Sequence, residues 1–143
     1  MEETYVELQD IPVMRVKADM KGDGPPAAFG LLESKLTSLR GRKFYGVYHK
    51  TPEGEEYFAC VAKTDDDNPD KVQLESGVIT GGSFVRRKVM DWKKVVSDGQ
   101  LPRLFNEMVM KHINEVDPDR FSIEFYRSSE ELLIFLPVKT ALA

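Results

Sequence analysis

A glutamate stands inside an aromatic segment near the C-terminus, FSIEFY at 121–126. Aromatic and β-branched residues predict a β-strand, and alternate residues of a strand point to opposite faces. The apolar residues then share one face, and the other face carries the remaining three, Ser122, Glu124 and Tyr126. Either that second face is open to water, or it lines a cavity in which Glu124 is the one charge.

A carboxylate on a dry aromatic wall has two chemical uses. It attracts a lipophilic cation, and each aromatic face adds a cation–π attraction of roughly 0.5–2 kcal/mol. Alternatively, burial raises its pKa, so that Glu124 serves as a general acid or base. The plain alternative is a solvated carboxylate on an open sheet face, with Tyr126 in an ordinary cross-strand aromatic pair.

Length and composition narrow the class of protein. The chain has 143 residues, 41% of them hydrophobic and 31% charged, which fits one globular domain. Its formal net charge of −4 gives no reason to expect direct contact with nucleic acid. It has no apolar run long enough for a membrane span, and its single cysteine, Cys60, excludes an internal disulfide. We therefore expect a soluble cytoplasmic domain without a membrane partner.

Three sequence features superficially match known phosphate-binding, calcium-binding or zinc-binding motifs, but each lacks an essential part of the motif. The segment GDGPPA at 22–27 matches a glycine-rich phosphate loop, but its two prolines remove backbone donors that a phosphate needs. The acidic segment at 65–70 lacks the glycine and the final glutamate of a calcium loop. His49 and His112 show no zinc-ligand spacing. We predict no cofactor and no metal site.

The order of predicted elements repeats along the chain. Residues 5–63 and 71–139 each predict strand, helix, strand, strand, and a polar linker at 64–70 joins them. Pro26 and Pro102, 76 residues apart, each stand where a helix should begin. The sequence therefore predicts a single α+β domain built from two similar halves.

The element boundaries follow from apolar spacing and from glycine and proline. One helix is predicted from Pro26, with leucines at near-helical spacing, to a stop at Gly41, and a second from Pro102 to about Val116. Strands are predicted at 5–20 with a break near Ile11, and at 44–50, 57–63, 72–79, 83–90, 121–127 and 132–139. Cys60 lies in an apolar strand and is predicted to be a small core residue.

Several segments carry a resemblance to a known family. They are IPVMRV (11–16), KFYGVYH (43–49), GGSFV (81–85), and IEFY (123–126) followed by LLIFLPVK (132–139). The chain resembles the GyrI-like small-molecule-binding domain, which is also the effector-binding domain of AraC-type and MerR-type multidrug regulators. The resemblance runs from about Tyr5 to Lys139, without a helix-turn-helix segment, so a stand-alone form is expected. Where the family often has a Gly-Pro pair, this chain has MDWKK (90–94).

The resemblance implies both a fold and a site. The fold is a pair of βαββ modules whose strands form a curved antiparallel sheet, with helices on one face and a ligand groove on the other. The groove is lined by aromatic residues around a central glutamate, which is Glu124 here. Around Glu124, the candidate ligand-binding residues are Tyr126, Tyr45, Tyr48, Phe58, Trp92 and Phe135. On the aligned parity, Tyr45 faces the groove and Tyr48 faces the helices, and for all of these residues core packing is the plain alternative.

Three functions are open at this point. The first is a sensor or sequestering protein for small amphipathic, often cationic, aromatic compounds. The second is a hydrolase of strained, cyclopropane-bearing alkylating compounds, as some stand-alone members of the family are, with Glu124 and Tyr45 as candidate catalytic residues. The third is an interaction protein with a macromolecular partner such as DNA gyrase.

Overall fold

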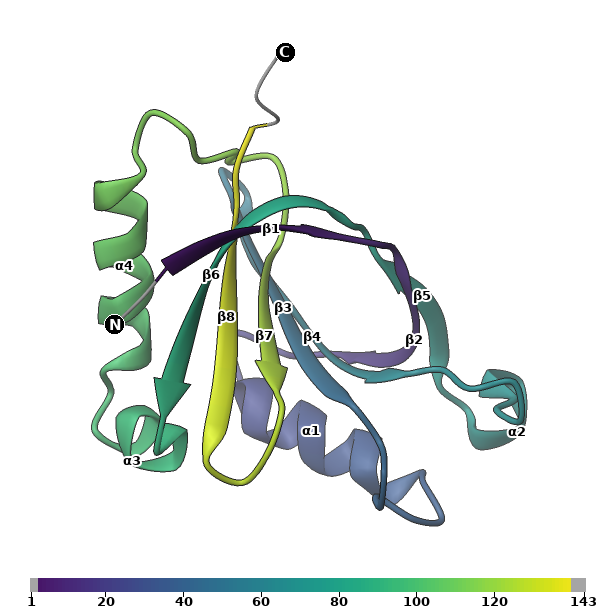
Figure 1. The fold of residues 1–143 in the computed structure, drawn as a ribbon. Helices are drawn as coiled ribbons and strands as arrows, with labels where there is room; N and C mark the ends of the chain where they lie inside the picture. The colour runs from purple at the N-terminus through teal and green to yellow at the C-terminus, as the bar shows by residue number, and fades with distance from the viewer. Residues whose placement is uncertain (1–2, 140–143) are drawn as a thin grey trace.

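The computed structural model describes residues 3–139 and shows an α+β fold, one curved antiparallel sheet with helices packed against it (Figure 1). The strands are β1 (Glu3–Leu8), β2 (Ile11–Lys17), β3 (Phe44–Thr51), β4 (Gly54–Ala62), β5 (Glu75–Ile79), β6 (Gly82–Met90), β7 (Ser122–Tyr126) and β8 (Glu131–Pro137). The helices are α1 (Gly24–Ser34), α2 (Pro69–Val72), α3 (Trp92–Ser97) and α4 (Leu101–Lys111).

The eight strands form one sheet in the order β1-β6-β8-β7-β3-β4-β2-β5. The two halves of the chain join at its centre, where β7 pairs with β3. Figure 1 shows β1, β2 and β5 arching around a concave interior, while α1 and α4 lie outside it. Each strand predicted from the sequence overlaps a strand of the structure, and the predicted break near Ile11 falls between β1 and β2.

The predicted helix ends were partly wrong. Helix α1 has its prolines in the first turn, as expected, but it ends at Ser34 rather than at Gly41. The amide of Lys35 bonds to the carbonyl of Leu32, an i→i+3 contact that tightens and closes the last turn. Leu36 still packs against the outer core, but Leu39 is 44% exposed, so the apolar spacing is not covered as far as Gly41.

The second half departs from the prediction in a similar way. Helix α4 ends at Lys111, not near Val116, and the short helix α3 precedes it in the segment for which no element was predicted. The polar linker is irregular only as far as Asn68. The side chain of Asn68 accepts a hydrogen bond from the amide of Lys71 and so caps α2.

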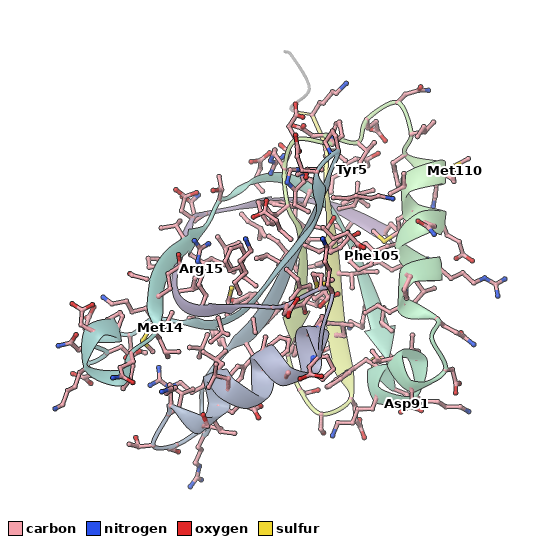
Figure 2. All side chains as sticks on the ribbon, turned by 180° about the vertical axis from the view of Figure 1, so that it is seen from behind. Tyr5, Met14, Arg15, Asp91, Phe105 and Met110 are labelled. Atoms are coloured by element: carbon pink, nitrogen blue, oxygen red, sulfur yellow. The ribbon has the colours of Figure 1, made fainter. Side chains whose placement is uncertain are left out.

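The core divides between the two faces of the sheet. In Figure 2, Arg15 points into the concave interior and its neighbour Met14 points away from it, which shows the alternation along β2. The concave interior is filled by ten buried residues: Val13, Tyr45, Val47, Phe58, Cys60, Ile79, Phe84, Ile123, Leu133 and Phe135. On the outer face, α1 packs against β2 and β4, while α4 packs against β8.

The buried position predicted for Cys60 is confirmed. Its side chain is 0% exposed and lies in the concave core. Burial raises the pKa of the thiol to about 12, so at neutral pH the group is the uncharged, poorly nucleophilic form. Cys60 therefore has a packing role in the concave core.

No helix within residues 3–139 combines the length and apolar character needed to cross a bilayer.

His112, just after the end of α4, forms a hydrogen-bonded contact with the edge strand β1. His112 is 8% exposed, and its Nε2 lies 2.7 Å from Glu3 Oε1 while its Nδ1 lies 2.9 Å from Glu115 Oε2. Both ring nitrogens can donate only when the imidazole is protonated. Burial alone would lower the pKa of His112, but the two carboxylates outweigh it and hold that pKa above its usual 6.5.

We expect the stability of the fold to fall as pH rises through the raised pKa of His112. The contribution of His112 is complete below about pH 6.5, its unfolded value, and is lost once the folded histidine deprotonates. The measurement is the urea midpoint of unfolding between about pH 6 and about pH 9, for wild type and His112→Gln. The same slope in both proteins would show that His112 is not the titrating group.

Candidate functional site

Glu124 lies in the middle of β7, at the centre of the sheet. Its neighbours across the sheet are Gly46 on β3 and Ile134 on β8. The side chain is 8% exposed, and it lies on the outer, helix-covered face. The parity of β7 sets this orientation, because Ile123 and Phe125 pack into the concave core.

Two tyrosine hydroxyls donate hydrogen bonds to the same oxygen of Glu124. Tyr57 on β4 donates to Oε1 at 2.5 Å, and Tyr126 donates to Oε1 at 2.7 Å. The other oxygen, Oε2, accepts no hydrogen bond from any side chain or amide of residues 3–139. A carboxylate can accept about four hydrogen bonds, so Glu124 keeps acceptor capacity on one side.

Burial dominates the electrostatics of this group. Desolvation raises the pKa of Glu124 above its usual 4.5, and the two tyrosine hydrogen bonds offset only part of that rise. Burial, with the nearby carboxylate, also raises the pKa of Tyr57 and of Tyr126 well above 10, so both stay neutral donors. The cluster therefore holds at most one negative charge, and that charge resides on Glu124.

Two further aromatic rings cover the tyrosines. Phe29 of α1 meets Tyr126 edge to face at a centroid distance of 5.5 Å and meets Tyr57 at 6.2 Å. Trp92, the first residue of α3, meets Tyr126 at 4.9 Å, and its indole N–H donates to the Ser128 carbonyl at 2.9 Å. We call these five residues the Glu124 cluster: Glu124, Tyr57, Tyr126, Phe29 and Trp92.

A glycine makes the contact between β3 and the cluster possible. A Cβ atom on Gly46 would lie 1.9 Å from the Tyr57 hydroxyl and 2.5 Å from Glu124 Oε1. Real Cβ atoms do not approach so closely, so any larger residue would displace the carboxylate or the tyrosine. Gly46 therefore provides the space in which Tyr57 reaches Glu124.

No basic side chain within residues 3–139 forms an ion pair with Glu124. Arg87 on β6 shares the outer face, but Ile134 of β8 separates its backbone position from that of Glu124. Arg87 lies 3.6 Å from Glu107 of α4. A buried carboxylate without a cationic partner, framed by aromatic rings, can stabilise a cation brought by a ligand.

The structure brings only some of the predicted site residues together. Trp92 and Tyr126 join Glu124. Tyr48 shares its face, but the Tyr48 hydroxyl donates to the exposed Glu55 at 2.5 Å. The other three predicted companions lie on the opposite face in the concave core: Tyr45, Phe58 and Phe135. Tyr45 stacks on Phe125 there at 4.7 Å, so its predicted place beside Glu124 was wrong.

The expected position of Glu124 on a helix-free groove was also wrong. That expectation assigned the apolar face of β7 to the helices. The sheet instead curls around its own apolar residues and buries them in the concave interior, while the helices cover the face that carries Glu124. A cavity of about 330 Å³ does lie on the concave face, lined by other residues, Arg15 and Arg120 among them.

Sequence reasoning missed Tyr57 and Phe29. One signal was available: a glycine inside an aromatic strand, FYGVY, marks a close approach by another group. In the structure, that glycine, Gly46, faces both Tyr57 and Glu124. The contact of Phe29 depends on where α1 crosses the sheet, which no local pattern determines.

The chain resembles known proteins in its three-dimensional structure but not detectably in its sequence. No protein-family model matches the chain, and no curated protein sequence matches it. An integron cassette protein from the mobile metagenome of Vibrio cholerae superposes with a TM-score of 0.64 at 19% identity, covering 96% of this chain and 95% of its own. The protein SAV2435, solved bound to tetraphenylphosphonium, gives a TM-score of 0.69 at 14% identity, with 97% and 94% covered.

A third neighbour is the C-terminal domain of EcmrR, with a TM-score of 0.65 at 12% identity and 98% of each chain covered. All three likenesses extend over nearly the whole of both chains. The curved antiparallel sheet, the helices on one face and these neighbours show that the chain shares the fold of the three proteins, which is consistent with the resemblance to the GyrI-like small-molecule-binding domain.

Proposed function

We propose that the protein binds small lipophilic aromatic cations at the Glu124 cluster. The observation that carries this proposal is the carboxylate itself, which is 8% exposed and, among the residues that the structure describes, has no basic partner and one oxygen without a hydrogen bond. An ionised group in such a place is costly unless a charge of opposite sign joins it. A cationic ligand supplies that charge, and the surrounding rings supply cation–π contacts.

The aromatic residues of the cluster fit the same class of ligand. Tyr57 and Tyr126 hold Oε1 in place and stay neutral, so they orient the carboxylate without competing for its charge. Phe29 and Trp92 close the site in the unliganded protein, and one of them must move when a ligand enters. That SAV2435 was solved with tetraphenylphosphonium, a cation surrounded by four aromatic rings, supports this ligand class.

The test compares two ligands of the same shape and opposite charge, tetraphenylphosphonium and tetraphenylborate. The readout is local, because Trp92 is the one tryptophan of the chain and contacts Tyr126 directly. We expect tetraphenylphosphonium to change the Trp92 fluorescence in a saturable way and tetraphenylborate to have little effect. Equal responses to both ions would show apolar binding without a role for the Glu124 charge.

A further inference from the structure

We propose a second ligand site, on the concave face of the sheet, that takes a flat apolar carboxylate such as an aromatic monocarboxylic acid. This site goes beyond the proposed function and shares no residue with the Glu124 cluster. Its basis is the cavity of about 330 Å³, into which Arg15 and Arg120 both project. Because β7 alternates, Ile123 belongs to this cavity while Glu124 points to the other face.

Arg120 holds a half-buried positive charge that no carboxylate of residues 3–139 pairs with. Its Nη1 donates to the carbonyls of Ser83 at 3.1 Å and Val138 at 3.0 Å, and its Nη2 donates to the Gly81 carbonyl at 3.3 Å. Within residues 3–139 it forms no ion pair. The Nε–H and the second Nη2 hydrogen remain available to an incoming anion.

The second arginine is positioned differently. Arg15 is paired with Glu75 through Nε at 3.1 Å and Nη2 at 3.2 Å, so its charge is largely offset. Its guanidinium carbon lies over the Phe58 ring, 4.0 Å from the ring centroid. Arg120 lies against Phe84 in the same way, at 4.6 Å. Two guanidinium groups, each lying over an aromatic ring, suit a planar ligand better than a branched one.

The rest of the cavity is mainly apolar. Apolar side chains on three strands face it: Val47, Ile79 and Ile123. Phe121 adds an aromatic edge. Asp119 also lines the cavity, but its side chain is exposed. Water therefore screens its repulsion of a bound anion more strongly than it screens the attraction of the half-buried Arg120. The arrangement suits a carboxylate at Arg120 with an apolar ring system over Val47 and Ile123.

The experiment uses three naphthalene probes that differ in charge: 2-naphthoate, 2-naphthylmethanol and 2-naphthylmethylammonium. Binding is followed by NMR, through the backbone amides of Thr80 and Phe121 and the side-chain Nε–H of Arg120. We expect saturable shifts of all three signals with naphthoate, and affinity at least about tenfold weaker for the alcohol and the ammonium compound. Preference for the ammonium compound, or no saturation with naphthoate, would overturn the proposal.

Two variants test the site without relying on loss of Arg120. Thr80→Trp adds bulk at an exposed residue that lines the cavity, and should weaken naphthoate binding about tenfold or more. Val96→Trp, at an exposed residue on α3 away from the cavity, is the matched control and should leave naphthoate binding unchanged. Equal effects of the two variants would contradict the site.

Two further variants separate this proposal from the proposed function. Glu124→Gln should leave naphthoate binding unchanged, because Glu124 points to the other face of β7. Arg120→Lys keeps the charge but loses the planar fork, and should weaken naphthoate binding about tenfold. The same NMR spectra show whether the variant is folded like the wild type. If Glu124→Gln alone abolishes naphthoate binding, the anion occupies the Glu124 cluster and the concave site is wrong.

Discussion

Replacing Glu124 with glutamine is expected to weaken the binding of tetraphenylphosphonium tenfold to a hundredfold. The substitution keeps the size of the side chain and an acceptor oxygen for both tyrosines, but removes the charge. A contact with a charged group contributes roughly 1.5–3 kcal/mol, which corresponds to about that change in affinity. A neutral ligand of similar shape, triphenylphosphine oxide, should bind wild type and variant equally well. Calorimetric titration measures both.

The chain offers a matched control for this substitution. Glu55 also accepts a hydrogen bond from a tyrosine, Tyr48, at 2.5 Å, but it is exposed and lies outside the cluster. Glu55→Gln should therefore leave the affinity for tetraphenylphosphonium unchanged. Equal losses in the two variants would mean that overall charge, rather than the Glu124 carboxylate, controls binding.

The same substitution should not destabilise the fold at neutral pH. A buried carboxylate without a cationic partner opposes folding when it is ionised, since burial raises its pKa. A neutral glutamine removes that cost. An unfolding midpoint for Glu124→Gln equal to or above that of wild type would show that Glu124 is kept for binding at some expense of stability.

The second large effect is expected from Gly46→Ala. The added methyl group would lie 1.9 Å from the Tyr57 hydroxyl, 2.6 Å from its ring carbon Cζ and 2.5 Å from Glu124 Oε1. Overpacking of this kind destabilises a fold by roughly 1–3 kcal/mol, and moving either side chain breaks the 2.5 Å hydrogen bond. We therefore expect both a lower melting temperature and at least tenfold weaker cation binding.

A second glycine provides the control for Gly46→Ala. Gly30 lies inside α1, and a Cβ there meets no atom within 4 Å. Gly30→Ala should stabilise the protein by roughly 0.5–1 kcal/mol, because alanine favours the helix more than glycine does. Adding Tyr57→Phe to Gly46→Ala removes the closest colliding atom and should restore part of the stability. If Gly46→Ala behaves like Gly30→Ala, the close packing around Glu124 is wrong.

Much of the fold could be predicted because its signals are local. Alternation of apolar residues marked the strands, and the prolines at the starts of α1 and α4 marked two helices. The ends of the helices were harder. The leucines after Ser34 continue a helical spacing, and Leu36 packs against the outer core, yet the helix has already ended and Leu39 is 44% exposed.

The site was predictable to the extent that parity within one strand determined it. Glu124 and Tyr126 share a face because they are two residues apart, and this holds in any sheet. Which face the helices cover depends on the curvature of the whole sheet, and here the curl buries Ile123 and Phe125 in its own interior. Tyr57 joins the cluster through the register of two strand pairs, which the sequence does not specify.

Titration of the Glu124 carboxyl group tests most directly whether this buried carboxylate binds a cationic ligand. The carbon resonance of the Glu124 carboxyl group, assigned by comparison with Glu124→Gln, reports its pKa with and without tetraphenylphosphonium. We predict a pKa above the usual 4.5 in the free protein and a clear decrease on binding, because a bound cation favours the ionised form. A Glu124 that titrates like a surface glutamate, or whose pKa does not change when the ligand binds, would contradict the proposed site.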